Sequence, residues 1–142
     1  MTEDLGVIAA LDVGEARIGV AMNPPGVSIA QPFTTIDNDS MVNETIASLI
    51  RDHNVTKLVV GNPRNMQGND TKQTRYVEDF VEKLKSNINV PVFMQDEALT
   101  SVKAEEELKD RKSPYEKGDI DSLAATYILQ DYIEENVRVQ HA

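Results

Sequence analysis

Cysteine is absent from the 142-residue sequence. Disulfide bonds, thiolate zinc sites and cysteine nucleophiles are therefore all excluded. Histidine is also scarce: His53 falls at a predicted helix end and His141 in a predicted tail, positions typical of ordinary surface residues. No side chain of the sequence stands out as a nucleophile for covalent catalysis.

Long hydrophobic runs are missing too. The apolar run at residues 7–11 is far too short to span a bilayer, and no small-residue cleavage site follows it. The first charges of the chain are acidic, whereas a secretory leader begins with basic residues. We therefore expect a cytoplasmic protein with no membrane association. With 40% hydrophobic residues, residues 1–142 are expected to form a single globular domain with a real core.

The sequence also has few basic residues: it contains 14 Lys and Arg but 24 Asp and Glu, for a net charge of -10. This balance argues against simple electrostatic binding of nucleic acid, which prefers a basic surface. The acidic clusters fall mostly in terminal or helical positions, where they are typical of solvated faces. Basic residues recur near the motifs described below, so an acidic protein can still carry a local basic rim. These residues are Arg17, Arg64, Lys72, Arg75, Lys103, Arg111, Lys112 and Lys117.

Hydrophobic patterning predicts an α/β domain with the element order β-β-β-α-β-α-β-α-α. The expected strands are residues 6–13, 17–23, 28–36, 57–61 and 90–95, and the expected helices are residues 41–50, 70–84, 100–111 and 120–136. Short turns join the first three strands into an antiparallel meander, whereas the last two strands are reached through helices and should pair in parallel. We expect a mixed five-stranded sheet with helices on both faces, and Pro32 indicates an edge strand.

Acidic residues follow two of the most apolar strands. Asp12 ends the first strand, where a carboxylate is costly unless it is paired or bound to a metal. Its alternative role is that of a turn aspartate before Gly14. Asp96 and Glu97 end the fifth strand, where they could equally be the polar start of a loop or a helix cap. Each position alone is compatible with a structural or a functional role.

A third acid opens the last predicted helix. Asp119 is interpreted as its N-cap, a position that favours aspartate. Asp121 is followed one turn later by Ala124 and Ala125, and small residues at that spacing would let the helix approach the sheet closely. The carboxylate of Asp121 could then reach the strand ends.

The three acids Asp12, Glu97 and Asp121 converge on one edge if the sheet is built as expected. Hard divalent cations such as Mg²⁺ or Mn²⁺ prefer oxygen ligands, and phosphoryl-transfer sites typically use a few carboxylates. Two such ions can activate a water and stabilise the leaving oxygen. The combination predicts a metal site with these three residues as ligands and catalytic groups.

Residues 61–68 form a loop rich in Gly, Pro and Asn that leaves a predicted strand. Such loops can present backbone amides to anions, and Arg64 could contact a phosphate directly. Lys117, close to Asp121, could do the same. The alternative is a plain connecting loop and a solvated charge, and the composition alone favours that alternative.

Four segments together resemble the YqgF/RuvX family, whose members are known as Holliday-junction-resolvase-like proteins or pre-16S rRNA nucleases. The segments occur in the family's order and span nearly the whole chain. They are LDVGEARIGVAM (11–22), VVGNPRNMQG (59–68), QDEALTSVKAEEEL (95–108) and KGDIDSLAATYILQDY (117–132).

The resemblance implies an RNase-H-like fold, a divalent metal, a bacterial cytoplasmic setting and a role in maturing the 5′ end of small-subunit ribosomal RNA. The family's acidic positions fall on Asp12, Glu97 and Asp121. The other matched positions are Gly14, Arg17 and Gly19 in the first motif, Gly61, Pro63, Asn65 and Gly68 in the second, and Lys117 before the last acid. We expect substrate contacts from Arg17, Arg64, Asn65 and Lys117.

The sequence departs from the family's pattern at two places. Ala98 stands where the family usually has an arginine after Asp-Glu, and Asn62 and Arg64 stand where it usually has leucines. The missing arginine removes a phosphate or ion-pair contact, for which Arg64 could compensate.

The expected function is therefore that of a metal-dependent nuclease, a hydrolase of phosphodiester bonds, acting on RNA ahead of branched DNA as a monomer or homodimer. The alternatives are a Holliday-junction resolvase and a catalytically weak RNase-H-fold module that binds nucleic acid or protein. A sugar-kinase or actin-like ATPase shares the Asp-x-Gly turn but needs two such domains. A receiver-like signalling domain expects paired acids after its first strand and a lysine after its last, which this sequence lacks.

Overall fold

The computed structural model describes residues 5–64, 69–97, 100–111 and 114–136. The element order agrees with the order predicted from hydrophobic patterning. The strands are β1 (Val7–Val13), β2 (Arg17–Met22), β3 (Gln31–Asp37), β4 (Val55–Pro63) and β5 (Val92–Glu97). The helices are α1 (Val42–Asp52), α2 (Lys72–Lys85), α3 (Thr100–Arg111) and α4 (Lys117–Asn136).

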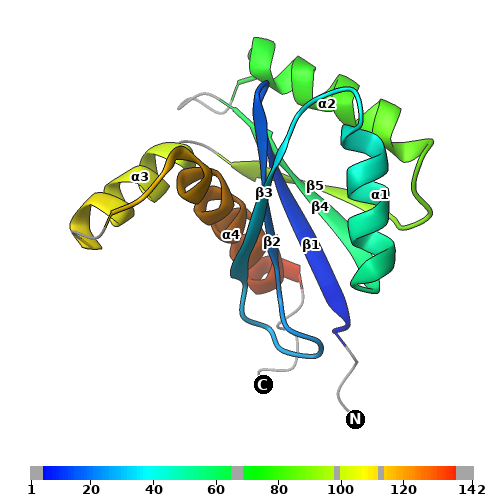
Figure 1. The fold of residues 1–142 in the computed structure, drawn as a ribbon, viewed down its shortest axis with the longest axis horizontal. Helices are drawn as coiled ribbons and strands as arrows, with labels where there is room; N and C mark the ends of the chain where they lie inside the picture. Colours follow the sequence, from blue (N-terminus) through cyan, green and yellow to red (C-terminus); the bar gives the residue numbers. More distant parts are fainter. Residues whose placement is uncertain (1–4, 65–68, 98–99, 112–113, 137–142) are drawn as a thin grey trace.

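The five strands form one mixed sheet in the order β3-β2-β1-β4-β5, drawn as ribbons in Figure 1. β1 and β3 both pair antiparallel with β2, while β4 pairs parallel with both β1 and β5. The predicted meander and the two parallel additions are thus confirmed. β3 is an edge strand, as Pro32 predicted, and the β2–β3 register shifts between Val20 and Ala21, beside the proline.

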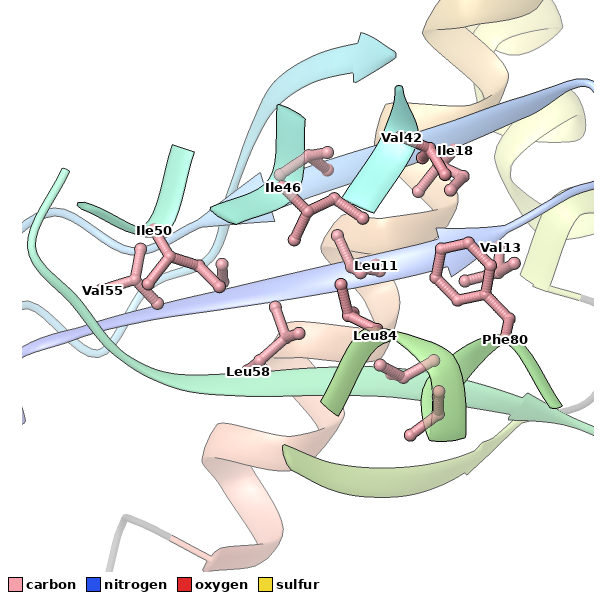
Figure 2. Close-up of a cluster of buried hydrophobic side chains, with 14 of the residues drawn as sticks. Leu11, Val13, Ile18, Val42, Ile46, Ile50, Val55, Leu58, Phe80 and Leu84 are labelled. Atoms are coloured by element: carbon pink, nitrogen blue, oxygen red, sulfur yellow. The ribbon is translucent and has the colours of Figure 1, made fainter. Parts of the chain in front are cut away.

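Helices α1 and α2 cover one face of the sheet, where the larger core cluster lies (Figure 2). Strand residues alternate between the two faces, so every second residue of β1 points into this cluster, as do Leu58 and Val60 of β4. The buried side chains labelled in Figure 2 are Leu11, Val13, Ile18, Val42, Ile46, Ile50, Val55, Leu58, Phe80 and Leu84.

Helix α4 covers the opposite face and crosses it from one edge to the other. Near its start, the carbonyl of Gly118 accepts a 2.6 Å hydrogen bond from Thr35 of the edge strand β3. Near its end, the Tyr132 ring packs against Phe93 of β5, with ring centroids 5.9 Å apart and the ring planes tilted by 36°. One helix therefore touches both edges of the sheet and passes over every strand between them.

Helix α3 packs on α4. Ala104 and Leu108 of α3 share a buried cluster with Leu123 and Ala124 of α4, and the Tyr127 hydroxyl donates a 2.7 Å hydrogen bond to Glu107. Among the described residues, no helix is long and apolar enough to cross a lipid bilayer.

Two helix starts differ by two residues or more from those predicted. α4 begins at Lys117, three residues earlier than expected, so Asp119 lies inside the first turn and accepts the amide of Glu116 at 2.9 Å. α2 is capped by Thr71, whose hydroxyl and amide exchange hydrogen bonds with Thr74. The predicted start of this helix at residue 70 is thus two residues too early, because the extended residue Thr71 provides the cap.

Strand boundaries also moved, and two of these shifts have a visible cause. β3 starts at Gln31 and not at residue 28, because the amide of Ala30 donates to the side chain of Gln130 at 2.9 Å. β5 runs to Glu97 and not to residue 95, because its parallel ladder with β4 continues to the pair Pro63–Glu97. This extension places Asp96 and Glu97 inside a strand, where adjacent side chains point to opposite faces.

Candidate active site

Asp12 lies near the carboxyl end of β1, on the face covered by α4. The residues at two and four positions before it, Ala10 and Ile8, belong to the cluster that α4 buries, and the period of two places Asp12 on the same side. Its partner across the antiparallel ladder is Gly19 of β2. Asp12 is partly buried, and its neighbour on the next strand carries no side chain.

Asp121 reaches this place because α4 rests on Gly19. A Cβ atom at position 19 would lie 1.9 Å from the carbonyl oxygen of Asp121, so only glycine permits this contact. The predicted close approach of α4 is therefore real, but its cause lies in the sheet. Of the two alanines expected to provide it, Ala125 faces the sheet, whereas Ala124 packs against α3.

Asp12 and Asp121 interact electrostatically. Burial, and after it the charge of Asp121, raises the pKa of Asp12 from 3.8 to about 6. Asp121 is held by Arg17, whose Nε donates to its Oδ2 at 2.7 Å. Within the described residues, Asp12 has no comparable ion pair or hydrogen bond, so the Arg17 guanidinium pairs with Asp121 alone.

Glu97 lies on the same face of the sheet but beside other acids. Burial raises its pKa from 4.5 to about 8; a hydrogen bond with Asp131 of α4 and the charges of Asp131 and Glu135 act in the same direction, while Lys103 opposes them. A hydrogen bond between two carboxyl groups requires a proton on one of them. Glu97 is thus held by Asp131 and not by the other two predicted acids.

The three predicted acids share one end and one face of the sheet, yet only Asp12 and Asp121 are brought together. No group of three or more Asp, Glu or His side chains among the described residues is close enough to hold a single ion. Glu97 would have to leave Asp131 before it could join the other two.

We expect Asp131→Asn to lower the pKa of Glu97 from about 8 towards its ordinary value. The substitution removes the charge of Asp131, and an amide can donate a hydrogen bond to a Glu97 carboxylate, which favours the ionised form. Carboxyl chemical shifts followed by NMR against pH would measure the change. An unaltered titration would place the cause in burial alone.

Arg64 is held on the other face of the sheet. It pairs with Asp70 and, through Nε at 3.1 Å, with Asp96. The Asn62 amide also donates to Asp96, at 3.2 Å, and Asn62 Oδ1 is buried without a hydrogen-bond partner among the described residues. The polar residues that replace the family's leucines thus form their own cluster, away from Asp12 and Asp121.

The other residues predicted to contact the substrate lie at different places. Arg17 lies in the site, against Asp121. Lys117 is the exposed first residue of α4, one turn before Asp121. Asn65 and Ala98 lie outside the described residues.

Asn38 and Gln73 support the site and were missed from the sequence. The side-chain amide of Asn38 donates to the carbonyl of Gly14 at 2.7 Å. The backbone amide of Asn38 donates to the carbonyl of Ala16 at 3.0 Å. Gln73 donates to the carbonyl of Val13 at 3.1 Å. These bonds fix the turn that follows Asp12. No local pattern marks either residue, because their partners are backbone atoms far away in the sequence.

The donor set fits a hard divalent cation. Asp12 offers a carboxylate that is partly buried, close to a second carboxylate and without a cation of its own. Oxygen ligands of this kind suit Mg²⁺ or Mn²⁺, and a bound cation would offset both the burial and the repulsion by Asp121 that raise the pKa of Asp12.

Comparisons with known proteins show which family the chain resembles. The family model described as "RuvX: Holliday junction resolvase" matches residues 6–135. A protein of Roseiflexus sp. (strain RS-1) named "Putative pre-16S rRNA nuclease" is 44% identical over 138 residues, covering 94% of this chain and 98% of the relative. A protein of Sulfurihydrogenibium sp. (strain YO3AOP1) with the same name is 40% identical and covers 89% of each.

Solved structures share the fold at low identity. Thermus thermophilus RuvC in complex with a Holliday junction substrate superimposes with a TM-score of 0.57 at 14% identity, covering 92% of this chain and 96% of RuvC. A Fowlpox virus resolvase bound to Holliday junction DNA gives a TM-score of 0.52, also at 14% identity, covering 93% and 99%. These matches confirm the RNase-H-like fold, and the sequence relatives confirm the resemblance noted above: the chain belongs to the RuvX family.

Proposed function

We propose that this protein is a metal-dependent nuclease that hydrolyses phosphodiester bonds, and that its substrate is the 5′ end of pre-16S ribosomal RNA. The observation that carries the proposal is the meeting of Asp12 and Asp121 over Gly19, at the carboxyl end of the central strand. The substrate is suggested by the names of relatives that align over most of their length.

Asp12 and Asp121 would hold the cation, either Mg²⁺ or Mn²⁺, with Glu97 as the third acid. The cation would activate a water and stabilise the leaving oxygen of the phosphodiester. Glu97 serves in this role when it gives up its hydrogen bond to Asp131. The turn after Asp12 is held by Asn38 and Gln73, which donate hydrogen bonds to its backbone carbonyl groups. This turn keeps the Asp12 carboxylate in place.

Phosphate contacts would come from Arg17 in the site and from Lys117 at the exposed start of α4. The predicted contacts of Arg64 and Asn65 belong to the same proposal, although Arg64 must first leave its two acidic partners. We propose a cytoplasmic protein, monomer or homodimer, that acts on RNA in preference to branched DNA.

A second candidate function is cleavage of Holliday junctions. It is favoured by the description of the family model and by the junction substrates named for two proteins of the same fold. Both functions use the same acids, so only the substrate separates them.

Asp121→Asn is expected to remove cleavage, whereas Asp119→Asn should leave it unchanged. Asp119 lies in the first turn of α4 and Asp121 just after it, but Asp121 faces Gly19 and Arg17, while the Asp119 side chain accepts the amide of Glu116. An asparagine oxygen can still accept that bond.

The assay uses a labelled RNA with a 16S precursor 5′ end and a four-way DNA junction, each with Mg²⁺, Mn²⁺ or EDTA. Metal-dependent cleavage of the RNA that requires Asp121 supports the proposal. Preference for the junction selects the second candidate, and no cleavage of either by the folded wild type overturns both.

A further inference from the structure

Arg17 is the only basic side chain within the described residues that forms an ion pair with a proposed metal ligand. It opens β2, and its Nε donates to Oδ2 of Asp121 at 2.7 Å. The Arg17 side chain is 38% exposed and that of Asp121 is 18% exposed. The chain's own cation thus occupies one oxygen of an acid that is proposed to bind a divalent ion.

The backbone that carries Arg17 is fixed. The amide of Gly14 donates to the carbonyl of Arg17 at 2.9 Å, and the amide of Asn38 donates to Ala16 at 3.0 Å. The side-chain amide of Asn38 also binds the Tyr76 hydroxyl at 2.9 Å. The turn therefore presents Arg17 from a rigid base, and any change of its partner must occur by side-chain rotation.

The pairing leaves the charge of the site unbalanced. Asp12 lies across the ladder from Gly19, next to Asp121, and the guanidinium contacts Asp121 alone of the two. A divalent cation carries twice the charge of an arginine and can bind oxygens of both aspartates. An arginine released from a carboxylate keeps all its donors and matches the geometry of a phosphate.

We propose that Arg17 is a built-in competitor of the divalent cation: it holds Asp121 while the site lacks a cation, and transfers to a substrate phosphate when Asp121 becomes a metal ligand. The inference rests on the proposed function, since it assumes a cation at Asp121. It adds that cation binding and phosphate binding are coupled through one side chain.

The exchange is energetically accessible. A partly exposed ion pair contributes only on the order of 1 kcal/mol, which corresponds to roughly fivefold in an equilibrium constant. Removal of the competitor should therefore tighten cation binding by a factor of about three to five, without altering the ligands themselves.

The test measures Mn²⁺ affinity by calorimetry in the absence of nucleic acid, so it does not depend on activity. Arg17→Gln is expected to bind Mn²⁺ about three to five times more tightly than the wild type. Arg51→Gln removes the same charge from an exposed position at the end of α1 and should leave the affinity unchanged. In an Asp121→Asn background, Arg17→Gln should have no effect, because the competition acts through Asp121.

Thermal unfolding in EDTA provides a second measurement. Arg17→Gln should unfold at a lower temperature than the wild type in EDTA, and the deficit should shrink as Mn²⁺ is added. If Arg17→Gln does not fold, Arg17→Met replaces it, because methionine keeps an apolar side chain of some length but carries no charge; a gain in affinity is again expected.

The outcomes separate the inference from the proposed function. Equal or weaker Mn²⁺ binding by Arg17→Gln, with binding that still depends on Asp121, overturns the inference alone. Binding that is indifferent to both Asp12→Asn and Asp121→Asn, or no binding by any variant, overturns the proposed metal site and the inference with it. Binding gained by Arg17→Gln in a protein whose wild type binds too weakly to detect supports the inference.

Discussion

Replacement of Gly19 by alanine is expected to lower the stability of the fold by about 3 kcal/mol and the rate of cleavage by about a hundredfold. The added Cβ would lie 1.9 Å from the carbonyl oxygen of Asp121, 2.2 Å from its carbonyl carbon and 2.8 Å from the amide nitrogen of Ser122. All three are backbone atoms, which cannot rotate away. The helix must lift by more than an ångström, and Asp121 leaves Asp12 with it.

Gly118→Ala is the matched control for Gly19→Ala, because both change a glycine at the contact between α4 and the sheet. A Cβ at position 118 would meet Thr35 at 3.5 to 3.8 Å, which is ordinary van der Waals contact. Alanine is also the better helix former, so the control should be as stable as the wild type or slightly more stable. Urea midpoints measure both variants. A Gly19→Ala protein with a wild-type midpoint and rate would show that α4 does not rest on β2 in this way.

Replacement of Asp12 by asparagine should reduce cleavage to the level seen in EDTA while it stabilises the protein in the absence of a cation. Asparagine fills nearly the same volume as aspartate but carries no charge. Its burial therefore avoids the desolvation of a charged group, and the charge of Asp121 does not repel it. Asp52→Asn, which makes the same change at the exposed end of α1, is the control for both measurements and should alter neither.

The stabilisation by Asp12→Asn should depend on pH. The pKa of Asp12 is raised from 3.8 to about 6, so the folded protein binds this proton more tightly than the unfolded chain. The resulting stability is fully present below pH 4 and is lost as the pH rises through about 6. Two pKa units correspond to about 3 kcal/mol, an upper bound for the gain from Asp12→Asn above that range.

Urea unfolding in EDTA between pH 4 and pH 8 measures this difference. The two proteins should be equally stable at the acid end and diverge as the pH rises, and Mn²⁺ should restore the wild type. A difference that does not change with pH would contradict the burial of an ionised Asp12.

The fold could be predicted almost completely from the sequence, because its hydrophobic periods are local signals. The apolar runs of β1 and β4 and the helical stripe of α2 each identify their element without help from the rest of the chain. Boundaries were less accurate where side chains far away in sequence decide them. Gln130, for instance, takes the amide of Ala30 out of the ladder, and no feature near Ala30 indicates this.

The sequence indicated which residues are candidates for the site, but not how they are arranged in space. The end of β1 and the start of α4 indicated Asp12 and Asp121, and a glycine inside a strand pattern, here Gly19, suggests a close approach of another segment. The crossing angle of α4 has no local signal, however. That angle places Asp131 beside Glu97, and so separates Glu97 from the other two acids.

The position of α4 in the chain also imposes an order in time. Translation delivers the five strands first, and the helix that contributes Asp121 comes after all of them. Until α4 emerges, the sheet face that holds Asp12 and the apolar residues around Val59 has no cover. The nascent chain therefore has no Asp12–Asp121 pair until α4 has been synthesised and docks on the sheet, so the two proposed ligands cannot act together before that point.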